Sequence, residues 1–159
     1  MFHRLWYIQL SDRRLRLSIH GSSIFFEDSP VVAISGEGQL RKIVAIGKAA
    51  EQLAGKPGHL IVRPFSNPRI AVDDYTVAEK LLQHAVRTMQ GKMSLFQQLM
   101  PLAKIVIHPE RQFDDGLTQI EARAFRELAS TVGGRIVALH TGAALNPQQL
   151  AQYDFHHRS

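Results

Sequence analysis

Residues 14–20, RLRLSIH, alternate between polar and apolar side chains without a break. Successive side chains of a β-strand point to opposite faces, so this pattern predicts a strand with one buried face and one face in water. Apolar residues at 5–10 precede it, and beyond a turn at Gly21 the chain returns through a further apolar run at 23–27. The start of the chain is therefore expected to form a three-stranded antiparallel meander.

A small insert is predicted to follow the meander, because Pro30 interrupts strand pairing. Its expected elements are a hairpin, a short helix and a further strand, at residues 31–34 with 42–46, 48–53 and 60–62. We interpret Gly36 and Gly38 as turn residues of the hairpin, because the strand-to-helix context of a phosphate-binding loop is missing. Residues 29–70 are thus expected to form a small α/β subdomain.

Helices and strands then alternate. Apolar residues recur at helical spacing over 76–89, where Asp73, Asp74 and Thr76 suit a helix start and Gly91 is expected just past the end. The later expected elements are a strand, a helix, a strand and a short helix, at 104–107, 118–132, 135–139 and 143–152. In the second helix Ile120, Ala124, Leu128 and Val132 are expected to form the buried face, with Phe125 beside it.

An antiparallel meander followed by such crossovers predicts an α/β fold, with a mixed five-stranded sheet, flanking helices and the small insert. Its main subdomain would comprise residues 1–28 and 71–159.

The composition limits the classes of function. The chain has 159 residues, 45% of them hydrophobic, and no cysteine, which excludes disulfides, zinc ribbons and thiol catalysis. No run approaches the roughly 18 apolar residues that span a bilayer, so we expect a soluble cytoplasmic protein that at most lies on a membrane. The net charge of +5 favours anionic surfaces, but the charges are scattered. Nucleic-acid binding is not expected, because no recognisable nucleic-acid-binding pattern accompanies them.

Several strings resemble the MreB family of bacterial actin homologues, the rod-shape-determining proteins. They are PVVAI (30–34), IVAIG (43–47), GKPG (55–58), RP (63–64), TVAEKLLQH (76–84), KIVIHP (104–109), QIEARA (119–124) and GGRIVAL (133–139). Their order and spacing resemble the family over residues 7–145. The resemblance implies the first domain of the actin-like ATPase (ribonuclease H-like) fold, with 29–70 as its small IB-like subdomain and the remainder as its IA-like subdomain.

The resemblance also implies where a nucleotide would lie and which groups would act on it. The family's first phosphate hairpin falls on Gln9, Leu10, Ser11 and Asp12, with Gln9 in place of a carboxylate and Ser11 in place of a glycine. A neutral amide lacks the charge that a magnesium shell requires, and Asp12 would point to the other face of the strand.

His140 and Thr141 stand at the positions where the resemblance places the family's hydrolytic carboxylate. Neither is a carboxylate, so the group that positions water is missing there. The second phosphate hairpin belongs to the family's other domain, which this chain does not include. We therefore expect a pseudo-ATPase that is not an enzyme, with no catalytic residue, cofactor or metal.

Three other clusters have open interpretations. Arg13, Arg14 and Arg16 would either bind phosphates or form a solvated strand face. His156 and His157, near Asp154, suggest a metal site, but a polar tail explains them better.

Met93, Leu95 and Phe96 resemble a hydrophobic loop by which some family members enter the membrane, with Lys92 suited to acidic headgroups. Alternatively, residues 93–100 form a helical turn that buries Leu95, Leu99 and Met100.

The function expected from the sequence is that of an MreB-like structural or interaction protein of the cell-shape machinery. It would be unable to hydrolyse ATP or to polymerise alone. Its expected partner is full-length MreB or another morphogenesis protein, with homodimers and a peripheral contact at the inner face of the membrane as further possibilities. Two alternatives remain open, an ATP-binding half-domain completed by a second chain and a peripheral membrane-binding scaffold.

Overall fold

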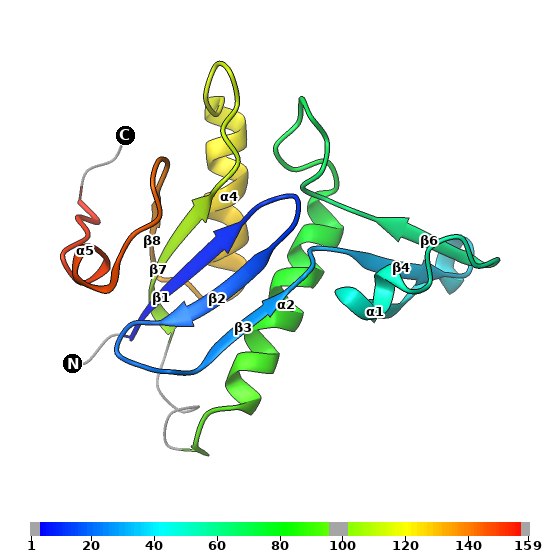
Figure 1. Ribbon diagram of the computed structural model, residues 1–159, viewed down its shortest axis with the longest axis horizontal. Coiled ribbons are helices and arrows are strands. Elements are labelled where there is room, and N and C mark those ends of the chain that lie inside the picture. The colour runs from blue at the N-terminus through cyan, green and yellow to red at the C-terminus, as the bar shows by residue number, and fades with distance from the viewer. Residues whose placement is uncertain (1–3, 96–101, 157–159) are drawn as a thin grey trace.

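The alternating strands build a mixed sheet (Figure 1), which the computed structural model describes over residues 4–95 and 102–156. Its strands are β1 (Arg4–Leu10), β2 (Leu15–Ile19), β3 (Phe25–Asp28), β7 (Leu102–Pro109) and β8 (Ile136–Leu139). The strand order is β3-β2-β1-β7-β8. The first three strands pair antiparallel, and β1 with β7 and β7 with β8 pair parallel. The five-stranded mixed sheet predicted from the sequence is thus confirmed.

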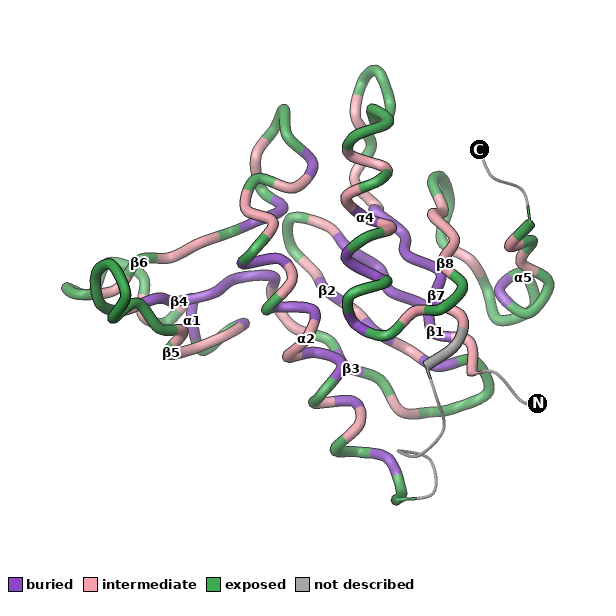
Figure 2. The backbone as a smooth tube through the Cα atoms, turned by 180° about the vertical axis from the view of Figure 1, so that it is seen from behind, coloured by how far each residue is buried: buried purple, intermediate pink, exposed green. Residues whose placement is uncertain are grey.

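Two long helices cover one face of this sheet. They are α2 (Tyr75–Gly91) and α4 (Gln119–Thr131). Each starts at a side-chain cap, since the Asp74 carboxylate accepts the Val77 N–H and the Thr118 hydroxyl accepts the Glu121 N–H. Their apolar faces meet the alternating side chains of β1, β2 and β7 in the main hydrophobic core. Figure 2 shows this buried layer running through β1 and β7 and along one side of α2.

A second sheet extends from the first. It consists of β4 (Val32–Ser35), β5 (Lys42–Ile46) and β6 (His59–Val62), in the order β5-β4-β6 with antiparallel pairing. The short helix α1 (Lys48–Glu51) contributes Ala50 to a cluster with Val31 and Ala33. A 3-10 turn, η1 (Gly38–Leu40), closes the hairpin, and Gly36 and Gly38 have the positive φ values expected of turn residues. All three strands lie within 29–70, while the division into two subdomains stays a prediction.

The opposite face of the main sheet is covered by the end of the described chain. Helix α5 (Pro147–Ala151) buries Leu150 against Tyr7 and Val106, with Tyr153 and Phe155 packed beside them. Among the described helices, none combines the length and the apolar character needed to cross a membrane.

Three details of the sequence-based expectation are wrong. Ile120 does not join the buried face of α4, because it lies in the first turn and 82% of it is exposed. The rest of the predicted face is confirmed at Leu128, Val132 and Phe125, which are buried, while Ala124 is half-buried and Ala129 joins the buried set. Gly91 is the last residue of α2, whose C-cap is Lys92. The final helix is shorter than 143–152, because Asn146 caps it and Pro147 begins it.

Candidate functional site

The three parallel strands end at one edge of the main sheet, where the sequence places the candidate site. Strands β1, β7 and β8 end at Leu10, Pro109 and Leu139. Backbone bonds continue past these ends, from the Glu110 N–H to the Leu10 carbonyl at 2.7 Å and from the His140 N–H to the Ile107 carbonyl at 2.9 Å. Side chains from loops distant in sequence therefore gather at this edge, where ligands of open α/β sheets commonly bind.

The turn between β1 and β2 is closed by its own serine. The Ser11 hydroxyl accepts the backbone N–H groups of Arg13 at 3.2 Å and Arg14 at 3.0 Å, and the Ser11 N–H donates to the Arg14 carbonyl at 2.9 Å. Asp12 is exposed at the tip of this turn. Leu10 is 2% exposed and belongs to the main core, on the face opposite Gln9. The hydroxyl of Ser11 thus serves the turn itself.

Gln9 is the polar residue that this strand buries. It is 8% exposed, and its side-chain amide donates to the Glu110 carboxylate at 3.5 Å, at the outer limit of a hydrogen bond. The Arg14 guanidinium donates to both oxygens of the same carboxylate, at 3.2 Å to Oε1 and 3.1 Å to Oε2. Arg14 also pairs with Glu27 at 3.4 Å, and Arg16 pairs with Glu27 at 3.5 Å. The charges at this edge of the sheet are therefore neutralised by one another.

Arg16 on β2 and Arg14 directly before it are partly exposed and pair with acidic side chains, which fits the interpretation of a solvated strand face. Arg14 and Arg16 alternate on the face away from the main core. Besides its ion pair, Arg16 stacks on the Phe25 ring, with its guanidinium carbon 4.3 Å from the ring centre. Arg13 is exposed at the turn.

A buried histidine that the sequence did not indicate lies one strand away. His108, at the end of β7, is 1% exposed, and its Nδ1 lies 2.7 Å from the Tyr7 hydroxyl. Its Nε2 lies 3.0 Å from the Gly142 carbonyl, and the Tyr7 oxygen also accepts the Leu145 N–H at 3.1 Å. A carbonyl can only accept, so Nε2 carries the proton and Nδ1 accepts from Tyr7. The neutral imidazole therefore satisfies every polar group in this chain of bonds.

Burial determines the protonation of this pair. It lowers the pKa of His108, an effect to which the nearby His140 adds, and it outweighs the opposing hydrogen bond to Gly142 and the charge of Glu110. Burial likewise raises the pKa of the Tyr7 hydroxyl. Near neutral pH both groups are uncharged, and together they attach the loop after β8 to the sheet.

His140 and Thr141 follow directly after β8 at this edge. The His140 ring contacts that of His108 edge-on, with centres 4.6 Å apart. Its Nε2 lies 2.8 Å from the Ala143 carbonyl, and its Nδ1 lies 3.3 Å from the Tyr153 hydroxyl. Both nitrogens of His140 therefore have partners in its own loop and in the segment that follows α5, while Thr141 is exposed.

The predicted histidine pair lies at the end of the described chain. The His156 N–H donates to the Asp154 carboxylate at 2.8 Å, whereas His157 lies outside the described residues. Over residues 4–95 and 102–156, no three His, Asp or Glu side chains gather closely enough to hold a metal ion.

The predicted membrane loop needs a correction at its first residue. Met93 is 7% exposed and packs in the main core, where its sulfur lies 3.7 Å from the Arg4 guanidinium. It is therefore an anchor of the segment and not part of an exposed loop. Leu95 is 80% exposed, which contradicts the alternative that buried it. Phe96, Leu99 and Met100 lie outside the described residues.

The sequence did not indicate Tyr7, His108 or Glu110 as site residues. Tyr7 and His108 lie 101 positions apart, and only the pairing of β1 with β7 brings them together. The sequence does carry one signal for His108, which directly follows the apolar run 105–107. A histidine on a buried strand needs hydrogen-bond partners, so its position indicates a polar contact there.

A family model described as MreB/Mbl protein matches residues 7–145 of this chain. The cell shape-determining protein MreB of Escherichia coli strain K12 is 31% identical over 143 residues, which cover 87% of this chain and 38% of the relative. The cell shape-determining protein Mbl of Bacillus subtilis strain 168 is 28% identical over 141 residues, with the same two coverages of 87% and 38%. The chain thus spans less than two fifths of the length of these relatives.

Solved structures show the same fold. The crystal structure of MreB 5 of Spiroplasma citri bound to AMPPNP superposes with a TM-score of 0.69 at 20% identity, over 89% of this chain and 39% of the other. A MamK double helical filament gives a TM-score of 0.58 at 13% identity, over 87% of this chain and 41% of the other. At these identities the likeness establishes the actin-like fold that the sequence predicts.

Proposed function

Because this chain belongs to the MreB/Mbl family of cell shape-determining proteins, we propose that it is a nucleotide-independent interaction module of the bacterial cytoskeleton. It would dock on MreB filaments or on another morphogenesis protein, in the cytoplasm at the inner face of the membrane. The observation that carries the proposal is the self-paired polar network of Gln9, Arg14 and Glu110, which lies where the family resemblance places a nucleotide.

The residues at this position do not fit magnesium and nucleotide phosphates. Mg²⁺ prefers carboxylate oxygens, whereas Gln9 offers a neutral amide and the Glu110 carboxylate is already bound by the Arg14 guanidinium. Breaking that ion pair would leave a partly buried charge without its partner. The Ser11 hydroxyl accepts hydrogen bonds from the N–H groups of Arg13 and Arg14. In a phosphate hairpin such N–H groups would donate to the ligand.

The second position also argues against hydrolysis. Orienting a water molecule for attack on a phosphate needs a free acceptor beside it. His140 has both nitrogens in hydrogen bonds, and its Nε2 is the donor to the Ala143 carbonyl. We therefore propose that the chain is not an ATPase.

The proposal also limits self-assembly. Head-to-tail filaments join two different surfaces of each subunit, so each subunit must carry both. The match to the E. coli relative, over 143 residues, covers 38% of that relative. A molecule with one of the two surfaces would bind a filament end without extending it, and we assign that contact to residues 29–70.

The test is retention of the chain by full-length E. coli MreB immobilised on beads. We expect retention with and without nucleotide, and loss of retention when residues 29–70 are blocked by an antibody fragment raised against them. An antibody fragment against α5 is the matched control. No retention at concentrations well above micromolar would overturn the proposal.

A second candidate function is peripheral membrane binding through the segment after α2. It is favoured by Leu95, which is 80% exposed beside the anchored Met93. Lys92 lies three residues earlier and donates to the Phe25 carbonyl at 2.9 Å, and an exposed leucine near this cation suits a membrane that carries acidic headgroups.

Flotation with vesicles of phosphatidylglycerol and phosphatidylethanolamine tests this candidate. We expect the double variant Leu95→Asp, Phe96→Asp to float less than the parent. Ile120→Asp is the control, because Ile120 is equally exposed on α4, at 82%. Equal flotation of parent and double variant would reject the segment as an anchor.

A further inference from the structure

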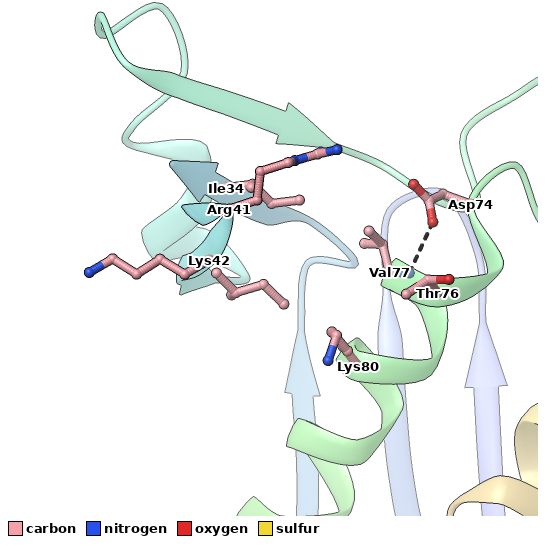
Figure 3. A pocket seen from close by; sticks show the side chains of 8 residues that line it. Ile34, Arg41, Lys42, Asp74, Thr76, Val77 and Lys80 are labelled. Carbon is pink, nitrogen blue, oxygen red and sulfur yellow. Dashed lines mark hydrogen bonds between the residues drawn. The ribbon is translucent and has the colours of Figure 1, made fainter. Parts of the chain in front are cut away.

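A cleft of 680 Å³ lies between the second sheet and the first turns of α2 (Figure 3). Its apolar surface comes from Ile34 and Ile43 on the sheet and Val77 on the helix. A volume of this size lies in the range of about 300–1,000 Å³ that is usual for sites taking small ligands or several side chains. The cleft is separate from the edge of the main sheet described above, since none of its lining residues belongs to β1, β7 or β8.

The walls of this cleft carry an excess of positive charge. Arg41, Lys42 and Lys80 line it, against the single carboxylate of Asp74. Figure 3 shows Arg41 reaching from the sheet toward the helix and Lys80 standing on the helix, whereas Lys42 extends away from α2. Asp74 accepts the Val77 N–H at 3.0 Å as the helix cap. It is therefore already engaged by the backbone of α2.

These three cations lack protein partners within the part of the chain that the structure describes. By contrast, Arg63 of the same segment pairs with Glu51 at 3.2 Å. Cations that face one another across a concave apolar surface repel each other and concentrate a positive potential there. An anion between Arg41 and Lys80 would relieve that repulsion.

The cleft also borders an open strand edge. Strand β5 is the outer strand of the second sheet, and its first residues, Lys42 and Ile43, line the cleft. An outer strand leaves backbone N–H and C=O groups unpaired in its sheet, and an extended peptide can pair with them. Along such a peptide alternate side chains would face the apolar surface and the cations.

We propose that this cleft is the docking site for an extended peptide segment of a partner protein, in which acidic and apolar side chains alternate. The acidic groups would lie between Arg41 and Lys80, and the apolar ones on Ile34, Ile43 and Val77. The net charge of +5 on the chain steers such a partner toward it. This inference deepens the proposed function, on which it rests for the existence of a protein partner.

Fluorescence anisotropy with the full chain tests the inference. The probe is a short fluorescein-labelled peptide in which glutamate and leucine alternate. We expect binding that weakens about tenfold or more in the double variant Arg41→Glu, Lys80→Glu. The control is Arg13→Glu, Arg135→Glu, which makes the same change of charge at two exposed positions outside the cleft. It should retain nearly the affinity of the parent.

Three outcomes would overturn the inference. Equal weakening in both double variants would mean unspecific attraction to a basic protein. Equal binding of a peptide with serine in place of leucine would remove the role of the apolar surface. Self-association of the parent in sedimentation velocity, abolished by Arg41→Glu, Lys80→Glu, would make a second copy of this chain the occupant.

The two proposals can fail separately. If MreB retains the cleft variant and the peptide does not bind, only the cleft inference fails. If the peptide binds at the cleft and MreB retains neither parent nor variant, the assignment of the partner as MreB fails. A thermal melt of each variant by circular dichroism establishes that it is folded.

Discussion

The buried imidazole of His108 makes the stability of this chain depend on pH. Burial lowers its pKa below the ordinary value of 6.5, so folding favours the neutral form. The unfolded chain therefore binds a proton at a higher pH than the folded chain does. The stabilising contribution is complete above about pH 6.5, the unfolded value, and is lost as the pH falls through the folded pKa.

We expect the parent to lose stability, relative to His108→Gln, as the pH falls from 7.5 toward 5. The glutamine does not titrate in this range, so the difference between the two stability curves isolates the imidazole. Urea denaturation followed by circular dichroism at several pH values measures it. Parallel curves for the two proteins would contradict the prediction.

The Tyr7 hydroxyl should contribute more to stability than that of Tyr153, although both side chains belong to the same apolar cluster. Tyr7→Phe leaves the His108 Nδ1 and the Leu145 N–H without their partner, at a cost of about 1–3 kcal/mol. Tyr153 is the matched control, because its hydroxyl makes only longer contacts of 3.3 and 3.4 Å and is partly exposed. Equal losses of unfolding free energy in the two Phe variants would contradict this interpretation.

At this scale the sequence predicts departures from a family pattern at single residues, and those at Gln9 and Ser11 stay predictions. It was uninformative about the Tyr7–His108 pair, because their contact depends on the register between two strands. That register pairs Gln9 with His108 and Tyr7 with Val106, on strands that are far apart in the sequence. Alternation identifies which side chains share a face but not which strand lies beside it.

At the scale of elements, one glycine determines how the second sheet joins its helix. Gly47 lies between β5 and α1 with φ of 75°, and its N–H donates to the Val31 carbonyl at 2.8 Å. A Cβ at this position would overlap the Asp28 carboxylate. That carboxylate accepts the N–H groups of Ser29 at 2.8 Å and Lys48 at 2.9 Å, so it cannot move without losing both bonds.

Gly47→Ala should therefore destabilise the chain more than Gly21→Ala. Gly21 has nearly the same φ, 76°, but open space around it, so alanine there carries only the backbone strain of about 1–2 kcal/mol. Gly47 combines φ of 75° with ψ of −143°, close to a region that essentially only glycine adopts, so alanine there adds displacement of the Asp28 carboxylate to a backbone strain of its own. Thermal melts of the two variants compare them. A Gly47→Ala melting temperature equal to that of Gly21→Ala would mean that Asp28 yields at no cost.

Element types were predictable because the alternating and helical patterns are undisturbed, and element ends were less so. Ile120 has the spacing of the buried face of α4 but is exposed, since the first turn extends beyond the sheet that the helix covers. The bulge between Ala33 and Ile34 in the β4–β5 pairing likewise leaves no signal in the sequence. Such deviations depend on tertiary packing and not on local pattern.

At the scale of the whole molecule, saturating Mg-ATP or Mg-ADP should leave the melting temperature unchanged. A ligand that binds only the folded state stabilises it by about 2.7 kcal/mol at a hundredfold excess over its Kd. For a chain of 159 residues that is a shift of several degrees. A clear shift would mean that the Gln9–Arg14–Glu110 network opens to admit nucleotide, and that a second chain could complete the site.

The same reasoning predicts how the chain acts on filaments. If it offers only one of the two surfaces of a head-to-tail contact, it ends growth wherever it binds, because the next subunit finds no matching surface. We therefore expect no pelletable polymer from the chain alone, with or without Mg-ATP.

Substoichiometric amounts of the chain should shorten the filaments of full-length E. coli MreB, as seen by electron microscopy, without lowering the total polymer in proportion. A loss of polymer in proportion to the chain added would instead indicate sequestration of free subunits. Filaments formed by the chain alone would show that both surfaces lie within these residues.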